Sequence, residues 1–334
     1  MLFDMKAVTA DSAPAWRRFV ELFVITLVTA LAVIYALILV LDPYDSGRFT
    51  NYAVFGVVDE NPRTANASRG RDPVFDSVVI GNSRGQLLDP KRLSDGTGLS
   101  FVQLTTPGTG PQEQLALLRW FMRYHQRIGA VLLVADPLWC QQKLAPPAHP
   151  FPFWLYGESN FEYSIHVLDA KALDLAWRRT LLWLGLRKRS RPDGYWDYEA
   201  GRTWAFQPKT PVDFAPATTH ARPPTVSFPA VELLRATLAD LDKDVPVAIV
   251  MPPPFFTELP ARGDPNAGSV AQCKGALQEI TTQRPRGVFL DFETDGEITR
   301  NPKNFMDEVH YRAPIARLIE SRVASALSIP TVAK

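Results

Sequence analysis

The longest apolar stretch of the 334-residue chain lies near its N-terminus, over residues 22–41. This stretch, LFVITLVTALAVIYALILVL, carries no charged side chain, and as a helix it is about 30 Å long, the thickness of a bilayer core. Arginines 17 and 18 precede it and two aspartates follow, so the positive-inside tendency places the N-terminus in the cytoplasm. The pattern predicts a cytoplasmic segment over 1–18, a transmembrane helix over 19–41 and an extracytoplasmic remainder. A cleaved signal peptide and a buried core helix are the alternatives.

The polar stretch after this helix shows little periodicity and is rich in Asp, Arg, Asn and Gly. Pro43 stops the helix, because proline cannot continue the hydrogen-bond ladder. The sequence therefore predicts a juxtamembrane linker over 42–74 and one large domain over 75–330.

Five short apolar runs within that domain are typical of the buried strands of a parallel sheet. Helical patterns over 112–126, 230–242 and 267–282 separate several of them. This alternation predicts an α/β fold, a parallel sheet flanked by helices. The runs are 77–80, 101–104, 130–135, 245–251 and 288–292.

A long interruption between the third and fourth strands, at about 140–228, predicts an insertion. It is rich in proline and holds several tryptophans, whose faces suit either stacking on sugar rings or a small satellite core. These tryptophans are Trp154, Trp177, Trp183, Trp196 and Trp204.

Composition excludes several classes of function. The net charge of +1 provides no strong field for nucleic acid. No Walker loop, HExxH motif or Cys/His cluster with metal-ligand spacing is present, so neither a metal nor another cofactor is expected. The two cysteines, Cys140 and Cys273, either pair in an oxidising compartment or remain free thiols.

Candidate chemistry begins at the carboxyl end of the first predicted strand. Reactive groups collect at such ends in parallel sheets, and Gly81-Asn82-Ser83-Arg84 follows the strand directly. A serine at a strand-to-helix turn is placed as a nucleophile, and its backbone N–H as an oxyanion donor. The alternative is an N-cap or turn serine.

The next two predicted strands also end in candidate site residues. Gly108 follows the second strand, where glycine permits a close backbone approach and its N–H can bind an oxyanion; the alternative is a loop glycine. Asp136 follows the third strand and either organises a hydrogen bond in the pocket or caps the next segment.

Asp307 and His310, near the C-terminus, have the spacing of an orienting acid and a general base. Three residues apart, the carboxylate can hold one imidazole nitrogen while the other faces a serine hydroxyl. The alternative is an Asp cap beside an exposed histidine.

Gly-Asn-Ser after the first strand, a glycine after the second and Asp-x-x-His near the end together resemble the SGNH (GDSL-type) hydrolase superfamily. The N-terminal helix makes the chain similar to its membrane-tethered branch, which includes the alginate O-acetylation proteins and the D-alanyl transfer protein of teichoic acid modification. The resemblance implies a flavodoxin-like sheet, Ser83, His310 and Asp307 as a catalytic triad, and Ser83 and Gly108 as oxyanion donors. Asn82, Arg84 and Asp136 are further pocket candidates.

The chain departs from this family's pattern at two positions. Asn82 stands where the family usually has Asp, and Asp136-Pro137 replaces the usual Gly-x-Asn-Asp, which leaves the Asn oxyanion donor unassigned. An ionised Asp136 would repel an oxyanion.

The resemblance implies acyl transfer or ester hydrolysis on a cell-envelope polysaccharide or lipid-linked glycan, with a membrane-bound O-acyltransferase as partner. Tethering favours transfer, because it raises the effective concentration near such a partner. Two alternatives are a catalytically inactive adaptor that binds glycan or docks on an acyltransferase, and an ordinary esterase that happens to be anchored.

Overall fold

A computed structural model describes residues 12–328 apart from 51–53, 55, 209–225 and 262. Its centre is a five-stranded parallel sheet in the order β2-β1-β3-β4-β5, which confirms the predicted α/β fold. This is the flavodoxin-like doubly wound order, in which the chain reverses its direction of travel between β1 and β3. The strands are β1 (Ser77–Ile80), β2 (Phe101–Gln103), β3 (Ala130–Val134), β4 (Val247–Met251) and β5 (Gly287–Asp291).

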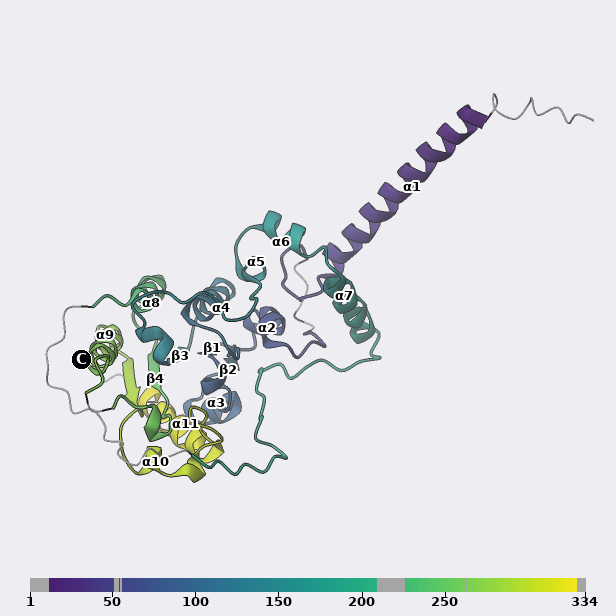
Figure 1. Ribbon diagram of the computed structural model, residues 1–334. Coiled ribbons are helices and arrows are strands. Elements are labelled where there is room, and N and C mark those ends of the chain that lie inside the picture. The colour runs from purple at the N-terminus through teal and green to yellow at the C-terminus, as the bar shows by residue number, and fades with distance from the viewer. Residues whose placement is uncertain (1–11, 51–53, 55, 209–225, 262, 329–334) are drawn as a thin grey trace, which may run out of the picture.

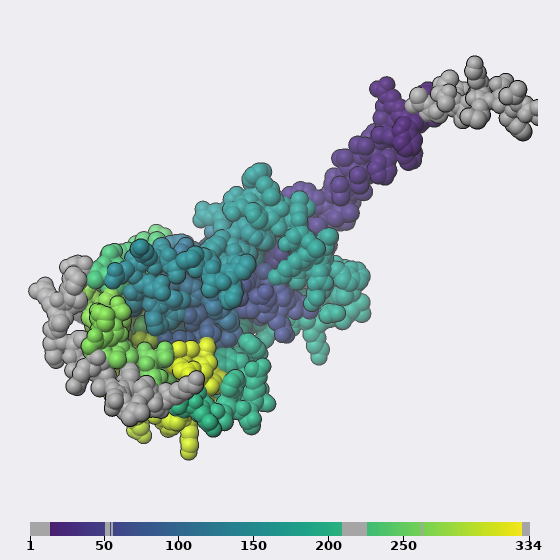
Figure 2. Space-filling model, viewed as in Figure 1, coloured from purple at the N-terminus to yellow at the C-terminus, as the bar shows by residue number. Residues whose placement is uncertain are grey.

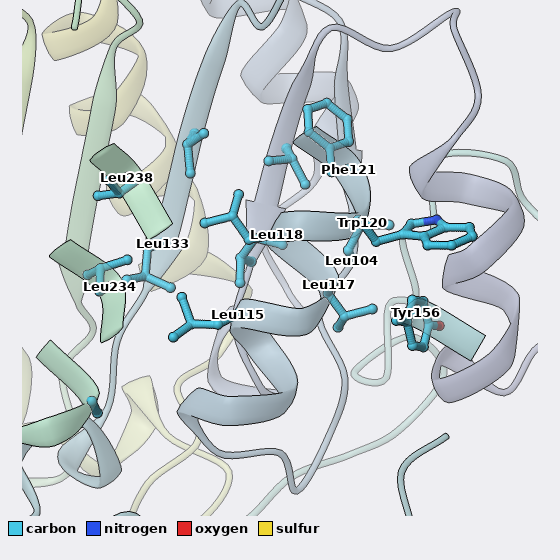
Figure 3. Packing of buried hydrophobic residues seen from close by; sticks show 14 of the residues in the cluster. Leu104, Leu115, Leu117, Leu118, Trp120, Phe121, Leu133, Tyr156, Leu234 and Leu238 are labelled. Carbon is cyan, nitrogen blue, oxygen red and sulfur yellow. The ribbon is translucent and has the colours of Figure 1, made fainter. Parts of the chain in front are cut away.

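Alternate residues of the strands face two separate hydrophobic cores. On one face, Ile80, Leu133 and Ile249 pack against α4 (Pro111–Tyr124), α8 (Pro229–Ala239) and α9 (Ala267–Thr282). On the other face, Val79 and Leu132 pack against α3 (Pro90–Thr97) and α11 (Ala313–Leu327). Figure 3 shows Leu115 and Leu118 of α4 pointing toward Leu133, with Leu234 and Leu238 of α8 beside them.

The N-terminal helix α1 (Ser12–Leu41) projects from this domain (Figures 1 and 2). It is long and apolar enough to cross a membrane, with a mean hydropathy of 2.9 in its most apolar part, and most of its side chains are exposed. Its last turns pack into the domain: Ile38 is buried in the same core as β1, and the Tyr35 hydroxyl donates to the Ser164 carbonyl. Helix and domain therefore meet in a packed joint.

Residues 42–74, predicted to form a linker, instead include α2 (Pro62–Gly70), most of which is buried. The polar residues that suggested a solvated segment bond within the protein: the buried Asp45 carboxylate pairs with Arg71 and Arg179. Small side chains such as Ala67 let α2 approach α4, whose Trp120 indole donates to the Ala67 carbonyl. Because these partners are far apart in sequence, periodicity did not reveal them.

The inserted region supplies three short helices near the base of α1 and an extended segment that crosses to the far end of the domain (Figure 1). Its tryptophans serve different purposes: Trp154 packs against the core, while Trp177 and Trp196 are exposed. Cys140 and Cys273 form a disulfide, which decides the alternative left open above. The remaining helices and 3-10 turns are η1 (Ser83–Gly85), η2 (Pro137–Cys140), α5 (Phe153–Tyr156), α6 (Asn160–His166), α7 (Ala170–Trp183), η3 (Phe256–Glu258), α10 (Glu297–Arg300) and η4 (Pro302–Asn304).

Candidate active site

Ser83 lies at the first residue of η1, just beyond the carboxyl end of β1. The chain turns sharply there because Gly81 passes close to β3: a Cβ on this glycine would lie only 3.0 Å from that of Val134. The Asn82 side chain caps the turn by accepting the Arg84 N–H at 3.0 Å. Ser83 therefore stands beside the point where the strand order reverses, the usual ligand site of such sheets.

Asp307 and His310 lie in a tight loop before α11. An antiparallel bridge between Phe305 and Tyr311 closes the loop, and the Met306 N–H donates to the His310 carbonyl. The Asp307 carboxylate accepts the His310 backbone N–H at 2.8 Å and the imidazole Nδ1 at 2.7 Å. The loop itself therefore orients the imidazole.

The two segments, 227 residues apart in sequence, meet at Ser83. The distance between Ser83 Oγ and His310 Nε2 is 2.9 Å. A second contact holds the segments together: the buried Tyr311 hydroxyl donates to the Arg84 carbonyl at 2.5 Å. Sequence reasoning missed Tyr311, although its place directly after His310 was a usable signal.

The positions of the protons on Ser83 and His310 follow from the ionisation of Asp307. Partial burial alone would raise the pKa of Asp307, but the hydrogen bonds from His310 and from the Val309 N–H outweigh burial and lower it. The carboxylate is therefore ionised at neutral pH and only accepts, so the Nδ1 of a neutral His310 carries the proton. Nε2 is then free to accept the Ser83 hydroxyl proton, as a general base must.

Ser83 and His310 open into a cleft of about 560 Å³. Segments that sequence reasoning did not assign to a site form much of its wall, above all the proline-rich stretch after β4. The apolar lining includes Leu138, Met251, Leu259, Val270 and Val309, and the acidic lining includes Glu258 and Asp264. The cleft thus offers a mainly apolar chamber with a hydroxyl and an imidazole on one side.

The remaining pocket candidates at this end of the sheet bond to the protein itself. The Asn82 amide and the Leu138 N–H both donate to the buried Asp136 carboxylate. Burial raises the pKa of Asp136 to about 6, against the opposing effect of Arg84. Arg84 forms an ion pair with Glu293 at 3.0 Å and donates to the Pro252 carbonyl. All three side chains line the cleft, and their hydrogen bonds and ion pairs to the protein hold them in place.

Gly108 lies in the loop between β2 and α4. Its φ of +66° explains the glycine, and a Cβ there would lie 3.0 Å from the His149 ring. Gly108 is not among the described residues that line the Ser83 cleft. The structure thus brings together Ser83, His310, Asp307, Asn82, Arg84 and Asp136. The Ser83 backbone N–H remains the candidate oxyanion donor within the cleft.

No protein-family model matches this chain, and a search of curated proteins found no significant match.

Proposed function

We propose that this protein is a membrane-anchored, SGNH-like serine acyltransferase or esterase that acts on O-acyl groups of a cell-envelope glycan. The observation that supports this most is the hydrogen-bonded series Ser83, His310 and Asp307, with distances of 2.9 and 2.7 Å, two members of which line a cleft. Such a series activates a hydroxyl for attack on an acyl carbon.

The reaction proceeds in two steps. Ser83 Oγ attacks the acyl carbonyl as its proton passes to His310 Nε2, and Asp307 stabilises the resulting imidazolium. The imidazolium then protonates the departing oxygen, which leaves an acyl ester on Ser83. A glycan hydroxyl attacks that ester and gives its proton to His310. The acyl–Oγ bond then breaks and the imidazolium returns the proton to Ser83 Oγ, which restores the serine and releases the acylated glycan; water in place of the hydroxyl gives hydrolysis.

The anchor supports transfer at a membrane. Helix α1 is long and apolar enough to span the bilayer, and the disulfide suits an oxidising, extracytoplasmic compartment. In this proposal the domain lies outside the cytoplasmic membrane and receives its acyl group from a membrane-bound O-acyltransferase. Shared confinement to one membrane raises the effective concentration of the two proteins.

The test is a Ser83→Ala variant, with Ser321→Ala on the exposed face of α11 as the matched control. Two measurements apply: labelling of purified protein by a serine-directed fluorophosphonate, and the ester-linked acyl content of envelope polysaccharide in the producing cells. We expect Ser83→Ala to lose both signals and the control to keep both. Unchanged acylation in Ser83→Ala cells would reject the proposal.

A second candidate is an inactive adaptor that binds glycan or docks on an acyltransferase. It is favoured by the engagement of the Asn82 amide with Asp136 and by the lack of Gly108 among the described residues that line the cleft, which leave few identified oxyanion donors. Fluorophosphonate distinguishes the two candidates, because only an activated Ser83 reacts. The adaptor predicts no labelling of the unmodified protein but reduced acylation when the whole protein is absent.

A further inference from the structure

The surface beside the base of α1 is unusually apolar. More than half of the large apolar side chains that are exposed outside α1, among the described residues, belong to residues 161–186. Phe161 is 75% exposed and Trp177 is 62% exposed. Figure 2 shows these residues' segment, in teal, around the base of the projecting helix. We call residues 161–186 the juxtamembrane surface.

Helix α7 within this surface has three distinct faces. One face is buried in the domain and packs beside α1. The exposed part divides between an apolar strip of Leu173, Trp177 and the following Leu184, and a charged strip of Lys171, Asp174 and Arg178. An apolar strip beside a charged one is the pattern of a helix that lies in a membrane interface.

The position of this surface relative to the bilayer follows from the thickness of the hydrocarbon core and the length of α1. Arg17 and Arg18 stay at the cytoplasmic boundary, and a core of about 30 Å takes about twenty helical residues, so it ends near residue 38. Tyr35 lies before that end, yet its hydroxyl donates to the Ser164 carbonyl at 3.1 Å. Helical side chains point back toward the N-terminus, here deeper into the membrane. Ser164 and its neighbours Phe161 and Ile165 therefore reach the outer boundary of the core.

We propose that the juxtamembrane surface is immersed in the headgroup region of the extracytoplasmic leaflet as a second membrane contact. The proposal rests on α1 spanning the membrane. Phe161, Ile165 and Trp177 contact the upper acyl chains, where tryptophan is favoured. Arg187 and Lys188, which are exposed just after Leu186, meet lipid phosphates. The partner of this surface is the lipid bilayer.

The test uses four variants of the full chain, each with one added free cysteine that carries an environment-sensitive NBD label and with the native disulfide intact. Phe161→Cys and Trp177→Cys report on the proposed contact. Val28→Cys reports on the middle of α1. Trp196→Cys is the matched control, because Trp196 is 55% exposed but lies outside the juxtamembrane surface, beside Tyr198, whose ring is 6.5 Å from the His310 ring. The proteins are reconstituted in vesicles of phosphatidylethanolamine and phosphatidylglycerol, with and without lipids that carry a nitroxide on the acyl chain.

We expect the nitroxide to reduce the fluorescence at positions 28, 161 and 177 about twofold or more, and to leave position 196 unchanged. Quenching at position 28 alone would show that α1 lies in the membrane but that the juxtamembrane surface does not contact it, which would overturn the proposal. No quenching at any position would overturn both the span and this contact. Labels at 161 and 177 that are accessible in pure lipid but shielded in native membranes would also overturn the proposal, in favour of a protein partner.

Discussion

Two aspartates of this protein each organise a network of hydrogen bonds, with opposite results. The Asp45 side chain is fully buried; one carboxylate oxygen accepts Arg71 and Arg179 at 2.7 and 2.6 Å, and the other accepts Ser68 and Gly56. The Asp307 side chain is 46% exposed and holds His310, which in turn meets Ser83 at an open cleft.

The difference lies in what each network leaves available. Removing a carboxylate from water is costly, so the Asp45 network is stable only because protein donors occupy both oxygens. The Asp45 side chain itself has no exposed surface. In the Asp307 network the last member, the Ser83 hydroxyl, lines a cleft where another molecule can replace solvent. A buried network of this kind supports structure, while an open one supports chemistry.

The largest expected effect is on the open network. Asp307→Asn leaves the loop intact but favours the wrong imidazole tautomer, so we expect the rate of fluorophosphonate labelling to fall about 10³- to 10⁴-fold. Glu308→Gln, the exposed neighbour, is the matched control and should label at the original rate. Equal labelling rates for the two variants would show that Asp307 does not orient His310 for this reaction.

The next effect is on the closed network. Asp45→Asn leaves Arg71 and Arg179 without their shared buried anion, and we expect the free energy of unfolding to fall by about 3–5 kcal/mol, measured by urea denaturation. Asp95→Asn breaks only an exposed pair with Lys91 and should cost less than about 1 kcal/mol. Correctly folded Asp45→Asn protein should still label at Ser83. If Asp45→Asn lost fluorophosphonate labelling but kept its free energy of unfolding, the Asp45 network would not be purely structural, and the contrast with the Asp307 network would fail.

Asp136 combines features of both networks, since it is buried like Asp45 but lies in the cleft beside Ser83. Its raised pKa of about 6 means that the folded state binds a proton more tightly than the unfolded state. The resulting stability is complete below about pH 4 and is lost as the pH rises through 6. Asp136→Asn cannot titrate, so between pH 4.5 and 7.5 the free energy of unfolding of the unmodified protein should fall by about 2 kcal/mol relative to that of the variant. The measurement is urea denaturation of both proteins at both pH values. An equal difference between their free energies of unfolding at the two pH values would refute this prediction.

The sequence predicted the sheet well because its strands are continuous apolar runs, a local signal. It also placed Ser83 and the Asp307/His310 pair at one site, and the structure brings them together because that site is the carboxyl edge of the strands. Whether they catalyse a reaction stays a prediction.

Other features depended on distant partners and had no local signal. Asp45 and Arg179 are 134 residues apart, so the segment around Asp45 resembled a solvated linker. Gly108 was chosen because loop glycines permit close approach; its positive φ explains the glycine, and its role as an oxyanion donor stays a prediction. The cleft wall after β4 is formed by a proline-rich stretch without periodicity, which no strand or helix pattern could place.

The packed joint between α1 and the domain has a mechanical consequence. Ile38 and Tyr44 are buried in the same core as the sheet, so the domain cannot swivel freely on its stalk. Figure 1 shows α9, whose Val270 lines the cleft, at the end of the domain away from α1. If α1 spans the membrane, this rigid connection would hold Ser83 at a constant distance from the lipid surface. Under the proposed function, only acceptor hydroxyls presented at that distance from the membrane would reach Ser83, so the length and position of a polymer would help to select the substrate.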